Sequence, residues 1–155
     1  MTKDMKLEQI FEITRIRQET KEMDQPRFRI EGVEDAIAFF QREIASFDRE
    51  VFAVAVLNVK SDIIAFHIAH IGEISSTIVH PREIFKTAIL NNGARIIISH
   101  NHPSQDCTPS MEDLNVTSRL ARSGKLLGIE VLDHIIVSEV NSHSIREYNE
   151  ELFSV

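Results

Sequence analysis

Ser99-His-Asn-His-Pro-Ser-Gln-Asp-Cys-Thr-Pro-Ser-Met-Glu-Asp113 is the stretch that decides the fold of this chain. It follows the apolar run 94–98, whose β-branched residues predict a buried strand, and it crosses a proline-containing loop before a helix begins. Side chains two residues apart point to the same face of a strand, so we expect His100 and His102 to project together from the strand's C-terminal end. Asp113 falls in the first turn of the next helix, within reach of both.

These three side chains form a candidate metal site. Two imidazoles and one carboxylate leave the fourth position of a tetrahedral ion open, an arrangement typical of catalytic zinc. A second interpretation is structural, because Ser110-x-x-Asp113 also matches a helix capping box. The two interpretations are compatible, since a capped first turn would hold the ligand still.

Composition limits the class of protein. The 155 residues are 43% hydrophobic and 26% charged, as in one globular domain with its own core. No apolar run approaches a membrane span, and the polar N-terminus is unlike a signal peptide. The single cysteine, Cys107, excludes an internal disulfide framework and favours a reducing cytoplasm. The formal net charge of −7 argues against strong non-specific DNA binding.

Helices and strands are predicted to interleave along the chain. An apolar stripe in residues 3–23 predicts an amphipathic helical extension over residues 1–26, which packs on the core or on a second copy. The predicted strands are residues 51–57, 63–71, 74–79, 94–98, 129–137 and 142–145. The predicted helices are residues 33–47, 81–92, 110–127 and 148–153. This order predicts one α/β domain over residues 27–155.

The side chains outside the central motif have mainly structural interpretations. His67 and His70 are interpreted as strand residues and His80 as a helix-cap residue, with a place beside the site as the alternative for His80. His134 interrupts an apolar strand, where a satisfied core histidine is the first interpretation and a contact to a metal ligand the second. Cys107 is interpreted as a loop residue, because a further thiolate would fill the open position of the metal.

The central motif resembles that of a known family. His100-x-His102-Pro103, six residues, Ser110, two residues and Asp113 is similar to the JAMM motif of the MPN/JAB metallopeptidases. Ser99-His-Asn-His-Pro-Ser104 resembles the RadC family among them, and the similarity extends over about residues 47–153, with flanking agreement at 79–85 and 131–137. The resemblance implies an MPN/JAB-like domain with a central mixed β-sheet flanked by helices, in a cytidine-deaminase-like layering. It also implies one Zn²⁺ per chain, held by the two histidines and the aspartate.

The resemblance assigns roles to three further residues. Glu50, directly ahead of the first strand of the sheet, stands where the family has its general base, and Glu73 and Glu83 are the alternatives that pattern leaves open. Ser110 stands where the family has a donor to the oxyanion. Gln105 stands where RadC relatives commonly have glycine, so a positive φ there would strain the loop.

The function implied is zinc-dependent hydrolysis of a peptide or isopeptide bond by activated water, in the cytoplasm, with a peptide or protein as substrate. The family also carries an association with DNA repair, and DNA as a partner stays open. Two alternatives remain: a protein-binding module without turnover, connected with DNA repair or a mobile element, and a metal-dependent nuclease. No membrane association is expected, and the N-terminal segment is compatible with a homodimer.

Overall fold

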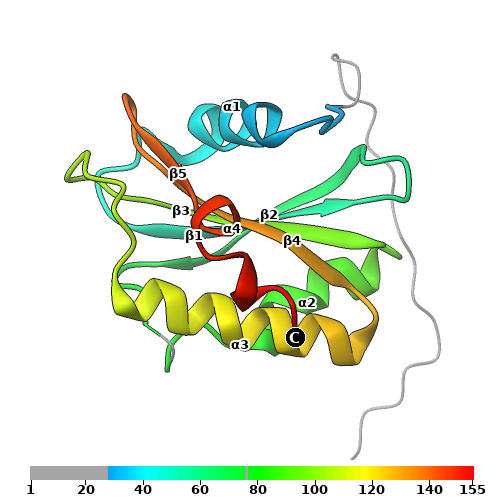
Figure 1. The fold of residues 1–155 in the computed structure, drawn as a ribbon. Coiled ribbons are helices and arrows are strands. Elements are labelled where there is room, and N and C mark those ends of the chain that lie inside the picture. Colours follow the sequence, from blue (N-terminus) through cyan, green and yellow to red (C-terminus); the bar gives the residue numbers. More distant parts are fainter. Residues whose placement is uncertain (1–27, 76) are drawn as a thin grey trace, which may run out of the picture.

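A five-stranded mixed sheet is the centre of the fold in the computed structural model, which describes residues 28–75 and 77–155 (Figure 1). The extension predicted over residues 1–26 therefore lies outside the described residues. The strands lie in the order β2-β1-β3-β4-β5. Their bounds are Val51–Leu57 for β1, Ile63–Ile71 for β2, Arg95–Asn101 for β3, Glu130–Val137 for β4 and Ser142–Ser144 for β5.

The direction of the strands follows from the connections between them. β1 is antiparallel to both β2 and β3, and β5 is antiparallel to β4. β3 and β4 are parallel, so the chain must cross over between them, and helix α3 (Met111–Leu127) makes that crossover. The C-terminal end of β3 and the N-terminal end of α3 therefore meet at one edge of the sheet, joined by the loop of the central motif.

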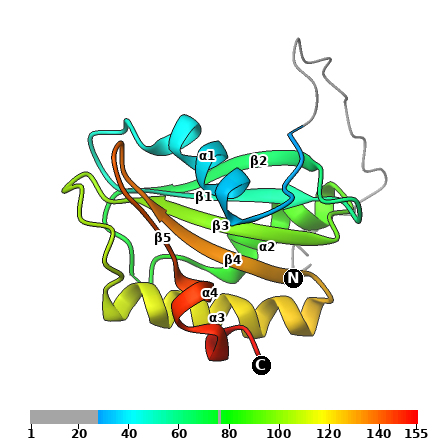
Figure 2. The ribbon, with the colours of Figure 1, turned by 45° about the horizontal axis from the view of Figure 1, so that its top comes forward.

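Helices cover both faces of the sheet, as Figures 1 and 2 show. Helix α1 (Val33–Ile44) lies on one face, and α2 (Pro81–Leu90) lies with α3 on the other. β1 is buried along its whole length because it lies inside the sheet and between the two layers, as its continuous apolar sequence predicted. Helix α4 (Ile145–Tyr148) and the short 3-10 helix η1 (Glu150–Leu152) follow β5.

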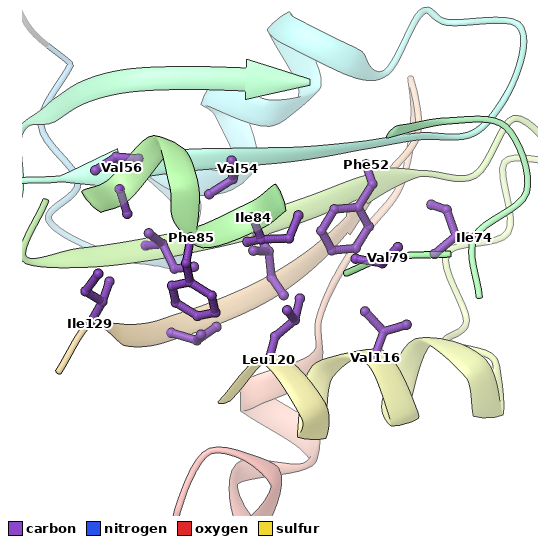
Figure 3. Close-up of a cluster of buried hydrophobic side chains, with 14 residues drawn as sticks. Phe52, Val54, Val56, Ile74, Val79, Ile84, Phe85, Val116, Leu120 and Ile129 are labelled. Carbon is purple, nitrogen blue, oxygen red and sulfur yellow. The ribbon is translucent and has the colours of Figure 1, made fainter. Parts of the chain in front are cut away.

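A buried apolar core fills the space between the sheet and helices α2 and α3 (Figure 3). Phe52 of β1 packs there with Ile84 and Phe85 of α2 and with Leu120 of α3. Burying a side chain of this size contributes roughly 1.5–3 kcal/mol. The opposite core, under α1, includes an aromatic group in which the ring centroids of Phe39 and Phe66 lie 5.5 Å apart.

Two details of the predicted secondary structure are wrong. The stretch 74–79 is not a strand: the N–H groups of Ile78 and Val79 donate to the carbonyl of Ser75 at 3.1 and 3.0 Å, which makes a turn. Ile74 and Val79 are apolar because they anchor this loop in the core.

The second detail is the C-terminal region: α4 begins at Ile145, inside the predicted strand 142–145, and the predicted helix 148–153 is reduced to the end of α4 and the 3-10 helix η1. Oγ of Ser144 accepts a hydrogen bond from the N–H of Glu147 and caps the helix directly after β5. Within the described part of the chain, no helix combines the length and apolarity that a membrane crossing requires.

Candidate metal centre

The two histidines of the motif lie at the end of a central strand. His100 pairs with Phe52 of β1 on one side and with Ile136 of β4 on the other, and it is fully buried. His102 follows the end of β3, and its backbone N–H donates to the carbonyl of Val137 at 2.9 Å. The sheet therefore holds the backbone of both histidines.

The three predicted ligands come together. Nε2 of His100 lies 2.9 Å from Nε2 of His102 and 3.2 Å from Oδ1 of Asp113. Nε2 of His102 lies 3.6 Å from Oδ2 of Asp113. One ligand atom from each residue lies within 4.8 Å of the others, as a group that could hold one metal ion requires. Imidazole nitrogen and carboxylate oxygen are donors that Zn²⁺ binds, so the donor set fits this ion.

Asp113 is also fixed by the helix cap. The N–H of Ser110 donates to Oδ2 of Asp113 at 2.7 Å, and the N–H of Asp113 donates to Oγ of Ser110 at 3.2 Å. This is the reciprocal capping box, so the structural interpretation of the two residues is confirmed. It does not compete with the metal site, because the same carboxylate faces the histidines.

The charges of the site suit a cation. Burial disfavours the ionised form of Asp113, but hydrogen bonds with His100 and His102 outweigh it and hold the pKa of Asp113 well below its ordinary value. Burial also disfavours the charged form of His102, but the hydrogen bond with Asp113 raises the pKa of His102 above its ordinary value. Asp113 is therefore ionised at neutral pH and ready to act as a ligand.

His134 contacts a predicted ligand, which the first interpretation of the sequence missed. Its Nε2 lies 2.8 Å from Nδ1 of His100, and its Nδ1 lies 2.6 Å from Oγ1 of Thr117. Complete burial lowers the pKa of His134 well below its ordinary value, so the ring is neutral. The sequence signal was the lone histidine in the apolar run of β4, but its neighbour could be identified only from the strand register.

A cleft of about 470 Å³ opens next to the three ligands. Glu50 lines it, together with Ser110 and Glu73. The backbone of Glu50 is fixed because its carbonyl accepts a hydrogen bond from the N–H of Gly72 at 2.8 Å. Its carboxylate is oriented by the N–H of Ile74, which donates to Oε2 at 3.2 Å. The loop that replaces the predicted strand 74–79 thus begins by positioning Glu50.

The other candidate residues lie outside this group. Glu83 pairs with Lys86 on the exposed side of α2, at an N···O distance of 2.8 Å. His80 occupies the N-cap position of α2. Cys107 is buried beside Ile136 and Ile145, as a structural loop residue.

The loop between the ligands carries the strain that its sequence suggested. Gln105 has a φ of 70°, in the region that favours glycine. Nδ1 of His102 lies 2.7 Å from the carbonyl oxygen of Asp106, in the same loop. The loop conformation therefore orients one of the two histidine rings.

Known proteins share this domain. The family model of a RadC-like JAB domain matches residues 30–151. A UPF0758 protein of Caldanaerobacter subterraneus is 46% identical over 120 residues, which are 77% of this chain and 52% of that protein. A UPF0758 protein of Halalkalibacterium halodurans is 42% identical over 134 residues, which are 86% of this chain and 57% of that protein. The chain thus spans about half the length of the curated relatives it matches.

Proposed function

This chain belongs to the RadC-like JAB domain family, and on that premise we propose that it is a zinc-dependent hydrolase that cleaves a peptide or isopeptide bond. The observation that carries the proposal is the convergence of His100, His102 and Asp113 beside a cleft that also holds Glu50. The three side chains would hold the metal, and the cleft would admit the substrate. When bound, zinc would act as a Lewis acid that lowers the pKa of a water molecule in the open position toward neutrality.

Glu50 is the proposed general base. Its carboxylate lines the cleft with Oε2 held by the N–H of Ile74, so its other oxygen can accept a proton from the attacking water. The same group would then deliver the proton to the leaving amine. This partly buried hydrogen bond to one oxygen fixes the orientation of the carboxylate, and orientation is what a proton-transfer group needs.

Ser110 is the proposed donor to the oxyanion. Its Oγ accepts the capping hydrogen bond from the N–H of Asp113, which uses a lone pair and leaves the hydroxyl proton available. Capping and donation are therefore compatible in one side chain. One such donor lowers the barrier by about 3 kcal/mol in well-studied enzymes.

The charge of the cleft favours a peptide over a nucleic acid as substrate. Among the described residues that line it are five acids and neither lysine nor arginine; the acids are Glu50, Glu73, Asp106, Glu112 and Asp113. Phosphate backbones are bound by basic groups, so this lining would repel DNA. The acidic lining therefore argues against the nuclease alternative.

The first experiment measures the metal content of the purified protein and its His100→Ala, Asp113→Asn and Glu50→Gln variants. We expect one zinc per chain in the wild type and in Glu50→Gln, and loss of zinc in the two ligand variants. Hydrolysis of a panel of peptides and isopeptide-linked lysines, followed by mass spectrometry, should fall about 10²–10⁴-fold in Glu50→Gln.

Glu83→Gln is the matched control, because it removes an equivalent carboxylate outside the cleft. We expect it to keep both zinc and activity. A wild type without zinc would contradict the metal site. A wild type with zinc that cleaves none of the panel would favour the protein-binding module.

A further inference from the structure

A buried chain of hydrogen-bonding groups lies behind His100. Nδ1 of His100 lies 2.8 Å from Nε2 of His134, whose Nδ1 lies 2.6 Å from Oγ1 of Thr117. The same Oγ1 lies 2.6 Å from the backbone carbonyl oxygen of Asp113. His100, His134 and Thr117 are fully buried, so each must find its hydrogen-bond partner within the protein.

The positions of the protons follow from which atoms can donate. A carbonyl oxygen only accepts, so the hydroxyl of Thr117 donates its proton to the carbonyl of Asp113. Without that proton, two oxygens 2.6 Å apart would repel each other. The hydroxyl then offers only a lone pair to His134, so Nδ1 of His134 carries the ring's single proton. Nε2 of His134 must accept, and it accepts from the Nδ1–H of His100.

We propose that Thr117 and His134 are positioning residues that keep His100 in the tautomer that binds a metal. With a proton held on Nδ1, His100 leaves Nε2 as the nitrogen that would bind a metal, and the metal would replace the proton that Nε2 shares with Asp113 and His102. In the reverse arrangement Thr117 would donate to His134, and the only ring proton of His100 would lie on Nε2, where it would block the metal. The inference rests on the metal site of the proposed function and not on the hydrolytic reaction.

The second histidine reaches the same state by a shorter route. Nδ1 of His102 lies 2.7 Å from the carbonyl of Asp106, which can only accept, so Nδ1 carries a proton and Nε2 is the nitrogen left for a metal. His100 is fully buried, and its Nδ1 has His134 as its partner in place of a backbone carbonyl. Thr117 lies on α3 and donates to the backbone carbonyl of Asp113. It therefore connects the His100–His134 pair to the helix that carries Asp113.

Thr117→Val and Thr117→Ser are the matched variants that test the inference. Valine keeps the shape but removes the hydroxyl, whereas serine keeps the hydroxyl. We expect Thr117→Val to weaken zinc affinity about 10–100-fold, measured by competition with a chromophoric chelator, and Thr117→Ser to remain close to the wild type. Circular dichroism checks that both variants are folded.

The second readout is the ¹⁵N spectrum of the histidine rings in the metal-free wild-type protein, which a merely structural role would not determine. We expect protons on Nδ1 of both His100 and His134, and loss of this form for His134 in Thr117→Val. The wild-type spectrum decides the question even if Thr117→Val proves too unstable to study.

Either of two results would overturn the inference: a proton on Nε2 of His134 in the wild type, or a folded Thr117→Val that binds zinc as tightly as the wild type. A wild type that shows the expected tautomers but binds no zinc would support the hydrogen-bond chain while contradicting the proposed hydrolase.

Discussion

Asn101 holds the residue that follows the proposed base: its Oδ1 accepts a hydrogen bond from the backbone N–H of Val51 at 2.7 Å. Its Nδ2 donates to the carbonyls of Phe47 and Arg49 at 3.3 and 3.1 Å. Asn101 is fully buried and lies between the two histidine ligands in the chain. The strand that leads to the candidate ligands therefore also fixes the segment that carries Glu50.

We expect Asn101→Ala to lower the free energy of unfolding by about 1–3 kcal/mol, because it leaves the buried N–H of Val51 without its acceptor. Urea unfolding followed by circular dichroism measures this. Asn91→Ala is the control, because the side chain of Asn91 donates to the carbonyl of Thr87 in a partly buried position. We expect Asn91→Ala to lower the free energy of unfolding by less. Equal losses in the two variants would show that Asn101 has no special role.

The convergence of the three candidate ligands could be predicted from the sequence because local geometry brings them together. His100 and His102 share the end of one strand, and one loop separates them from the capped turn that holds Asp113. The role of His134 could not be predicted in this way. Its contact with His100 depends on the parallel register of β3 and β4, in which Ile98 lies opposite His134 and Ile136 opposite His100. No short-range pattern specifies that register.

The errors in the predicted elements have a similar cause. An apolar run shows that side chains are buried, but it does not show the conformation of the backbone that buries them. Ile74 and Val79 reach the core from a turn, not from a strand. The sheet itself was predicted correctly where an apolar run is long and continuous, as in β1.

Gln105 adopts a positive φ in the ligand loop, and its buried Oε1 has no partner in the described part of the chain. We expect Gln105→Gly to stabilise the protein by about 0.5–1 kcal/mol. A non-glycine residue in the left-handed region costs about 1–2 kcal/mol of strain, which glycine removes. The greater conformational freedom of glycine in the unfolded chain offsets about half of this gain. Thermal unfolding measures the gain.

Asn92→Gly, in the turn after α2, is the matched comparison for Gln105→Gly. Asn92 also has a positive φ, of 51°, but asparagine tolerates this conformation better than glutamine. Its replacement should therefore gain less. A destabilised Gln105→Gly would mean that the glutamine side chain contributes contacts that outweigh the strain.

Cys107 should react slowly with thiol reagents in the folded protein. It is 6% exposed, and burial raises the pKa of its thiol, so little of the reactive thiolate forms at neutral pH. As the chain has one cysteine, the rate of iodoacetamide labelling at pH 7 reports this thiol alone. Labelling should accelerate in denaturing urea, and Cys107→Ser should keep its zinc. Rapid labelling of the folded protein would contradict this placement.

Asp133 couples β4 to the C-terminal helix α4 and should make stability depend on pH. Its Oδ1 accepts hydrogen bonds from the N–H groups of His134 and Arg146 at 2.7 and 3.1 Å, and its Oδ2 accepts one from Oγ of Ser144 at 2.6 Å. Burial nevertheless dominates and raises the pKa of Asp133 above its ordinary value. The folded protein thus favours the protonated, neutral form of this side chain.

The sign of the effect follows from proton linkage. Because the pKa of Asp133 is higher in the folded than in the unfolded chain, its stabilising contribution is complete below the unfolded pKa and is lost as the pH rises through the folded pKa. Asparagine is uncharged, has nearly the same shape as aspartic acid and can still accept the two backbone hydrogen bonds. Relative to the wild type, Asp133→Asn should therefore become more stable as the pH rises from about 4 to 7.

Urea unfolding of the wild type and Asp133→Asn across this pH range measures the change. Asp48→Asn is the control of opposite sign, because the Arg49 guanidinium lowers the pKa of the exposed Asp48. Relative to the wild type, the free energy of unfolding of Asp48→Asn should not increase as the pH rises. A difference between Asp133→Asn and the wild type that is constant from pH 4 to 7 would mean that the three hydrogen bonds fully compensate the burial of the charge.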